Sequence, residues 1–209
     1  DTLANLGALN TASTDDITVT VNDNAGTAVT ATDLSALGNK TVGKVTVSKA
    51  VAITGSNTEL TAALVTAGSR VFLGGGSDDA SVVLNDADGT SISATTLSNI
   101  GGQTNATVTV SNAIAIIGDH DQLTAALVTS GSKVEVSDAV VTVSDADATA
   151  ITAAELSAIG GATTGKVTVT NAVAITGSAA EATAALVTAG TLVAVSDAVV
   201  TVNDADATA

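Results

Sequence analysis

Val45–Gly55 reads VTVSKAVAITG, and two later segments repeat it closely: Val108–Gly118 reads VTVSNAIAIIG and Val167–Gly177 reads VTVTNAVAITG. The copies are separated by 63 and then 59 residues, and four extra residues around Gly74–Ser77 account for the difference. A repeat of this length is typical of a chain built from stacked structural units and not of a globule around one core. We therefore expect the function of the chain to depend on the surface that the stacked repeats present.

Each long repeat divides into two related halves. The first half is typified by residues 153–178 and the second by residues 179–209. Both halves read as a short helix, a glycine, a strand, a polar corner and a second strand. We therefore predict one continuous array over residues 1–209, with a half-repeat at 1–30 and long repeats at 31–91, 92–150 and 151–209.

Capping motifs mark where the helices begin. In a capping box, a Ser or Thr side chain and a Glu or Gln three residues later each accept a backbone N–H of the first turn. Three boxes and one Asp variant recur: Ser56/Glu59, Thr152/Glu155, Ser178/Glu181 and Asp119/Gln122. Glycines that tolerate a left-handed cap predict the helix ends at Gly38, Gly68, Gly101, Gly131, Gly160 and Gly190. Inward apolar stripes are predicted for Leu34/Leu37, Leu97/Ile100, Leu156/Ile159, Leu60/Leu64 and Leu123/Leu127.

Alternation of apolar residues with Thr predicts the strands. Strands of adjacent coils lie about 4.8 Å apart, whereas packed helices need about 8–10 Å between their axes. The two half types would relieve this mismatch if their helices lay on opposite sides, and a curved stack is the alternative. The predicted fold class is a mainly β repeat solenoid with short capped helices and no single globular core. Val45, Val108 and Val167 would then form a column along one axis.

Composition excludes several functions. The chain has no Cys, which excludes disulfides, thiolate zinc sites and a cysteine nucleophile. Its formal net charge is −15, from 21 acidic residues against 6 basic ones, so we expect no nucleic-acid partner. The apolar residues alternate with Thr and Ser, so we expect no membrane insertion. The acidic balance favours solubility and attraction for cations.

Acidic turns carry the strongest chemical signal. They recur in register as NDAD, SDAD and NDAD at residues 85–88, 144–147 and 203–206. Stacked carboxylates repel one another, and a divalent cation would relieve the repulsion. The candidate calcium ligands are Asp86, Asp88, Asp145, Asp147, Asp204 and Asp206. The alternative is a set of solvated turns, because Asn and Asp are ordinary turn residues.

Other polar residues are predicted to have structural roles and not to bind ligands or take part in catalysis. Asn112 and Asn171 occupy equivalent corners and are predicted to form a hydrogen-bonded ladder. The segment Gly74–Asp79 lacks the Lys-Ser/Thr of a phosphate-binding loop and reads as a loop insertion. His120 has no serine partner for a catalytic triad and is predicted to be a surface residue at a helix start.

Two surface modifications or ligands are suggested by short motifs. Asn39-Lys40-Thr41 and Asn105-Ala106-Thr107 are sequons, so Asn39 and Asn105 are candidate glycosylation sites. Thr-x-Thr pairs resemble those of flat ice-binding surfaces. Their columns are predicted to be interrupted at Phe72, Glu135 and Ala194.

The phrases VTVSNAIAI, AALVTAG and AELSAIGG, together with NDADGT turns, resemble the repeats of giant bacterial, especially cyanobacterial, cell-surface and extracellular matrix proteins. Gly74–Asp79 is weakly similar to the calcium-binding nonapeptide of haemolysin-type repeat proteins. The first resemblance covers the whole chain. It implies a secreted or cell-surface role, often with calcium, and it transfers no catalytic residue.

We therefore predict a structural extracellular protein, either a segment or a subunit of a filament or cell-surface layer. Neither end shows a polar capping unit, so the expected partners are neighbouring repeats or further copies bound end to end. The alternative is an adhesin that binds glycans or other cells through its outward Thr and Asp faces. An enzyme such as a polysaccharide lyase is not expected, because the only break in the repeat, Gly74–Asp79, has no basic group.

Overall fold

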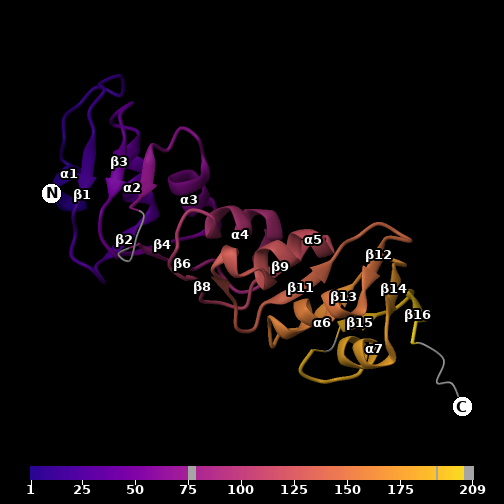
Figure 1. The fold of residues 1–209 in the computed structure, drawn as a ribbon. Helices are drawn as coiled ribbons and strands as arrows, with labels where there is room; N and C mark the ends of the chain where they lie inside the picture. Colours follow the sequence, from indigo (N-terminus) through magenta and orange to yellow (C-terminus); the bar gives the residue numbers. More distant parts are fainter. Residues whose placement is uncertain (75–78, 192, 205–209) are drawn as a thin grey trace, which may run out of the picture. The chain divides into compact units, whose positions relative to one another are not determined.

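The computed structural model describes residues 1–74, 79–191 and 193–204. Within these residues, four parallel sheets alternate with seven α-helices in an α/β arrangement (Figure 1). The chain divides into two compact units, and each unit contains one three-stranded and one five-stranded sheet.

The first unit comprises residues 1–86, 96–111 and 130–135. Its strands all pair in parallel and in register. The three-stranded sheet has the order β1 (Val19–Val21), β3 (Val45–Val47), β5 (Val71–Leu73). The five-stranded sheet has the order β10 (Val134–Glu135), β8 (Val108–Val110), β6 (Ser81–Leu84), β4 (Ala52–Gly55), β2 (Ala28–Thr30).

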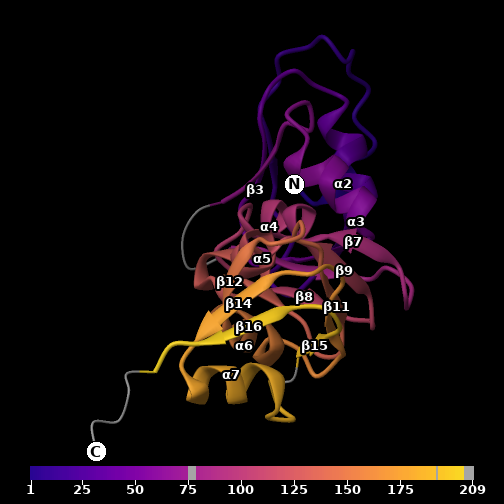
Figure 2. The same cartoon turned by 90° about the vertical axis from the view of Figure 1, so that its right-hand side faces the viewer.

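The second unit comprises residues 87–95, 112–129 and 136–209. Its five-stranded sheet has the order β15 (Val193–Val195), β13 (Val167–Val169), β11 (Val140–Val143), β9 (Ala115–Gly118), β7 (Ser91–Ser93). Its three-stranded sheet has the order β12 (Ala150–Thr152), β14 (Ala174–Gly177), β16 (Val199–Val202), and Figure 2 shows these strands side by side.

The predicted fold class, a mainly β solenoid without a globular core, is wrong. The structure has an α/β arrangement with a compact core, in which helices alternate with four separate parallel sheets. The predicted column of Val45, Val108 and Val167 is also absent from the described residues, because β3, β8 and β13 belong to three different sheets. The repeats therefore do not form one continuous stack of equivalent strands.

An additional short strand at the start of each long repeat explains this change of sheet. These strands, β2, β7 and β12, were not predicted from the sequence; they have three residues each and lie at the junctions near residues 30, 91 and 150. Each follows an acidic turn that contains a residue with positive φ, namely Gly26, Gly89 or Ala148. The turn directs the additional strand to the edge of β4, β9 or β14. At their other edges, β4 pairs with β6 and β9 pairs with β11. The two five-stranded sheets then continue from β6 to β8 and from β11 to β13.

Four of the seven described helices begin directly after the predicted capping residues, namely α3 (Asn57–Leu60), α5 (His120–Leu123), α6 (Ala153–Gly161) and α7 (Ala179–Leu186). The other three described helices are α1 (Leu3–Leu6), α2 (Ala31–Gly38) and α4 (Ala94–Gly101). All four predicted capping boxes are confirmed, each with both reciprocal hydrogen bonds, at Ser56, Asp119, Thr152 and Ser178. These bonds satisfy backbone N–H groups that a short helix would otherwise leave open.

The apolar stripes form the cores of the units. Leu34, Leu37, Leu97, Ile100, Leu156 and Ile159 are all buried, as predicted. Two helices continue as π-helical turns, η1 (Thr61–Val65) and η2 (Thr124–Val128), and a short 3₁₀ turn, η3, covers Ser130–Ser132. In η1 both Ala63 and Leu64 are buried, so the predicted Leu60/Leu64 stripe is confirmed, whereas in η2 Ala126 is buried and Leu127 is only half-buried. The predicted pairing of Leu123 with Leu127 assumed an uninterrupted α-helix.

The glycines at the ends of the longer helices have a different role from the predicted one. Gly38 is not in the left-handed conformation, and α2 ends at Asn39 with ordinary helical angles. A Cβ at Gly38 would instead overlap the carbonyl oxygen of Ser69 in the following half-repeat. Gly101 and Gly160 have the same relationship to Ser132 and Thr191. These glycines permit a close approach between successive halves.

Candidate functional site: acidic turns and an open strand edge

The first aspartate of each acidic turn caps the helix of its own half-repeat. Asp86 Oδ2 accepts the main-chain N–H of Asn57 at 2.6 Å, and Asp145 Oδ2 accepts that of His120 at 2.8 Å. Asp23 and Asp204 accept the N–H groups of Leu3 and Ala179 in the same way. Each acceptor faces the first residue of α1, α3, α5 or α7. The carboxylate therefore complements both an unpaired N–H group and the positive end of the helix.

The second aspartate of the turn connects to the corner of the next half-repeat. Asp88 Oδ1 accepts the main-chain N–H of Ala113 at 3.1 Å, and Asp147 Oδ1 accepts that of Ala172 at 3.0 Å. The DAD segments at 86–88 and 145–147 therefore each contact one helix and one corner through backbone amides. Sequence reasoning missed this role, although the signal was present in the recurrence of Asp after every second strand.

The candidate calcium ligands do not gather into one cluster. Among the described residues, no group of three or more His, Asp or Glu side chains is placed to hold a metal ion. Asp86, Asp88, Asp145, Asp147 and Asp204 each accept a backbone N–H, and Asp206 lies outside the described residues. The calcium assignment stays a prediction, and the geometry assigns these carboxylates to amide groups.

His120 adds a side-chain bond to its aspartate cap. Its Nδ1 lies 2.6 Å from Asp145 Oδ1, and its Nε2 lies 3.6 Å from the exposed carboxylate of Asp121. Burial opposes protonation, but the bond to Asp145 and the negative charges of Asp145, Asp121 and Glu155 raise the pKa of His120 above 6.5. The predicted position at a helix start is confirmed, but the prediction of a surface residue is not, because the side chains of His120 and Asp145 are only 14% and 4% exposed.

The glutamates of the capping boxes also accept backbone N–H groups, and these bonds change their pKa. The pKa of Glu59, Glu155 and Glu181 is lowered, first by the main-chain N–H of the capping residue and then by side-chain hydroxyl bonds. Stabilisation of the charged carboxylate is the expected effect of donors that point at it. These three acids serve helix starts and have no arrangement that suggests proton transfer to a ligand.

The two candidate glycosylation residues occupy one kind of loop but different positions in it. Asn39 is exposed at the end of α2, and its sequon hydroxyl on Thr41 is buried in bonds to Asp15 and Ile17 carbonyls. Asn105 donates its side-chain amide to Asp79 Oδ2 at 2.6 Å. A glycan on Asn105 would have to disrupt this bond, whereas one on Asn39 would not. Glycosylation of Asn39 and Asn105 stays a prediction.

The predicted ladder requires corner side chains to bond to one another, whereas at Asn171 the side-chain amide bonds to the main chain. Asn171 Nδ2 donates to the main-chain carbonyl of Asp145 in the preceding half-repeat. Asp79, which lies near the corner of an earlier half-repeat, instead accepts the main-chain and side-chain N–H groups of Asn105 through Oδ2. The rest of the insertion, residues 75–78, lies outside the described residues. The corners therefore use different partners in different copies.

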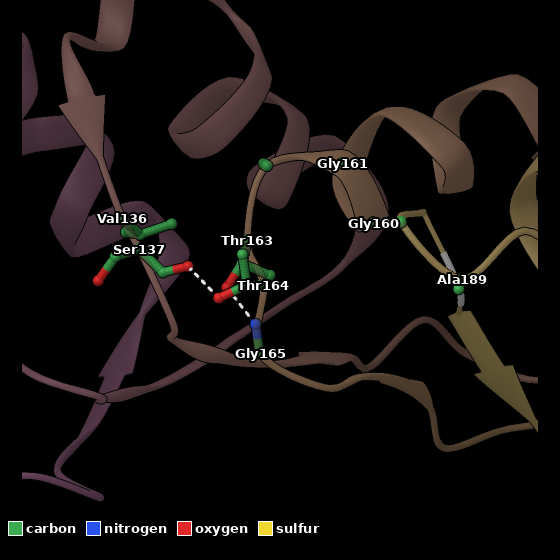
Figure 3. Close-up of a pocket in the computed structure, with 10 residues that line it drawn as sticks. Val136, Ser137, Gly160, Gly161, Thr163, Thr164, Gly165 and Ala189 are labelled. Atoms are coloured by element: carbon green, nitrogen blue, oxygen red, sulfur yellow. Dashed lines mark hydrogen bonds between the residues drawn. The ribbon is translucent and has the colours of Figure 1, made fainter.

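A groove of about 530 Å³ lies beside the end of α6 in the second unit (Figure 3). Gly160, Gly161 and Gly165 contribute much of its wall, and no titratable residue lines it. The Thr164 hydroxyl donates to the carbonyl of Ser137 at 2.8 Å, and the Thr163 hydroxyl accepts the N–H of Gly165 at 3.0 Å (Figure 3). The polar groups of the groove thus serve its own backbone and supply no acid–base pair.

The outward faces of the sheets carry mixed rows of side chains. Thr109 pairs with Glu135, Thr46 with Phe72, and Thr168 with Ala194. The predicted interruptions of the Thr columns are confirmed. Phe72 is half exposed, and the Lys44 ammonium lies 4.8 Å from its ring centre.

The outer edge of β16 differs from the equivalent edges of β6 and β11. Val200 and Val202 are 41% and 53% exposed, whereas Val82, Leu84, Val141 and Val143, which hold the same positions in earlier copies, are all 0% exposed. Within the described residues, β16 pairs only with β14. This edge is therefore an exposed strip of core-type residues.

Comparison with models of protein families, with curated proteins and with solved structures finds no match. The described helices include none with the length and apolar character needed to cross a membrane.

Proposed function

We propose that this chain is a structural scaffold module, in which repeated strands and capped helices build an extended surface assembly and perform no catalysis. The observation that carries the proposal is that the aspartates of the acidic turns bind backbone amides of the repeats themselves. Five of the six candidate ligands are described, and all five accept backbone amides. Asp86, Asp145 and Asp204 accept the first amide of the helix in their own half-repeat, and Asp88 and Asp147 accept an amide of the next half-repeat.

The pairing of successive half-repeats supports the same function. Val141 is in register with Ile116 on one side and with Val167 on the other, so a strand of one repeat joins the strands of the next. Parallel pairing of this kind extends by addition of further units, and each unit buries the apolar face of its neighbour. A scaffold needs such a regular interface and needs no specialised cleft.

The location in this proposal is the cell surface or extracellular matrix. Its support is the resemblance of the repeats to those of giant bacterial surface proteins, together with the net charge of −15, which favours a soluble and hydrated surface. An adhesin role has no specific observation in its favour, because the outward rows are chemically mixed.

Electron microscopy of native material, labelled with an antibody against this chain, tests the proposal. We expect the label on filaments or on a regular layer, with the same distribution after treatment with a calcium chelator. Label found only on dispersed particles would contradict the scaffold function. Loss of the assembly on chelation would restore calcium as a structural component.

A further inference from the structure

The open edge of β16 has the side-chain pattern of a strand that is paired on both sides. Its inward residues Val200 and Val202 correspond to Val141 and Val143 of β11, which are fully buried. In β11 the neighbour at the edge equivalent to the open edge of β16 is β13, with Val141 facing Val167 and Val143 facing Val169. Burial of the two Val side chains would remove apolar surface from water, which favours docking of a strand at this edge.

The backbone of β16 is arranged for the same partner. In β11, Val140 donates toward β9 and Val141 donates to the carbonyl of Lys166, which precedes β13. In β16, Val199 and Asn203 donate to Val173 and Gly177, on the β14 side. The alternation of a parallel strand then turns the N–H of Val200 toward the open edge.

The same kind of strand occupies this edge in three earlier copies. The residue before each Val-Thr-Val strand accepts the N–H of the equivalent valine: Lys44 from Val19 at 2.8 Å, Thr107 from Val82 at 3.0 Å and Lys166 from Val141 at 2.9 Å. All three strands run parallel to their partner and in the same register. The strand that fits this edge therefore has the sequence Val-Thr-Val and runs parallel to β16.

We infer that the β16 edge is a docking surface for a further repeat of this type, whose Val-Thr-Val strand pairs in parallel with Val200 facing the first valine. This inference rests on the proposed scaffold function and identifies the interface by which the scaffold extends. The docked strand would accept the Val200 N–H through the residue before its first valine. It would also cover the exposed faces of Val200 and Val202.

Amide hydrogen exchange measured by NMR tests this interface on the full chain. The chain is compared with a version in which a copy of residues 151–171, ITAAELSAIGGATTGKVTVTN, follows Ala209; this junction preserves the order found after Ala150. We expect the Val200 and Val202 amides to exchange roughly 100-fold more slowly in the extended chain. The matched control carries Val167→Asp and Val169→Asp within the added copy only.

Slow exchange in the extended chain and fast exchange in the control would support the docking surface. Equal exchange in all three chains, or equal protection by the control, would overturn it. Protection of Val200 in the original chain that rises with protein concentration would also overturn it, by showing a second copy as the occupant. A negative result in the hydrogen-exchange experiment would not by itself refute the scaffold function. That function is tested separately, by electron microscopy of where the chain occurs in native material.

Discussion

His120 and Asp145 form a two-point contact between α5 and the acidic turn that follows β11. The imidazole Nδ1 lies 2.6 Å from Asp145 Oδ1, and the main-chain N–H of His120 donates to Oδ2 at 2.8 Å. Asn57 makes the equivalent pair of bonds to Asp86 with a neutral amide. One geometry is thus maintained by a titratable group in one repeat and by a non-titratable group in another.

His120 predicts a stability that decreases as pH rises. Its pKa is higher in the folded chain than the usual 6.5, so its contribution is complete below that value and is lost as pH rises through the folded-state pKa. Thermal unfolding followed by circular dichroism between about pH 6 and pH 8 measures the effect. His120→Asn reproduces the Asn57 arrangement and should remove the pH dependence in this range. An equal slope in both proteins would contradict the assignment.

Asp86 is predicted to stabilise the start of α3 without a metal. Asp86→Ala leaves the Asn57 N–H without its charged acceptor and should cost about 2 kcal/mol in chemical denaturation. Asp88→Ala is the matched control in the same turn; it removes one longer bond to Ala113 from an exposed carboxylate and should cost less. Calcium at millimolar concentration should not change either result. A calcium-dependent rise in the stability of the original chain alone would count against the amide role.

Gly38 is predicted to tolerate no side chain. Gly38→Ala would force the new Cβ against the Ser69 carbonyl oxygen and should cost about 3 kcal/mol in the free energy of unfolding. Gly68→Ala is the control, since a Cβ there has no heavy atom within 4 Å and the backbone is not left-handed. If the two variants unfold at the same denaturant concentration, the close approach of the halves is wrong.

Ala148 is predicted to be a strained position. Its φ is 62°, whereas Gly26 and Gly89 hold the equivalent turns at 78° and 74°. Ala148→Gly should raise stability by up to about 1 kcal/mol, because the left-handed conformation is costly for a residue with a Cβ. The reverse change, Gly89→Ala, should lower stability by a similar amount. Differential scanning calorimetry of both variants provides the comparison, and a fall in stability for Ala148→Gly would refute the strain.

The local features of this fold were predictable from sequence because their causes are local. Ser56 and Glu59 lie three residues apart, and the capping box between them requires nothing from the rest of the chain. The inward valines also followed from simple alternation, and Val45, Val108 and Val167 are all buried. These features do not determine which strand lies beside which.

The features that sequence analysis missed depend on distant partners. Ser91–Ser93 has one apolar residue and no alternation to mark it, yet it pairs with β9 because the acidic turn delivers it to that edge. The aspartate caps join residues 20, 29 and 25 positions apart at Asp23, Asp86 and Asp145. Carboxylates in turns are common, so their type alone suggested calcium or solvent.

Disulfide trapping tests the central structural claim most directly, namely that the second strands of one repeat pair with the first strand of the next. The chain has no native Cys, so two pairs can be compared on the same background. Val83 and Thr109 are register partners on β6 and β8, and Val83→Cys with Thr109→Cys should form an intramolecular disulfide under mild oxidation. A single stack would place β5 beside β8, so efficient bridging of Phe72→Cys with Thr109→Cys, without bridging of the first pair, would contradict the account.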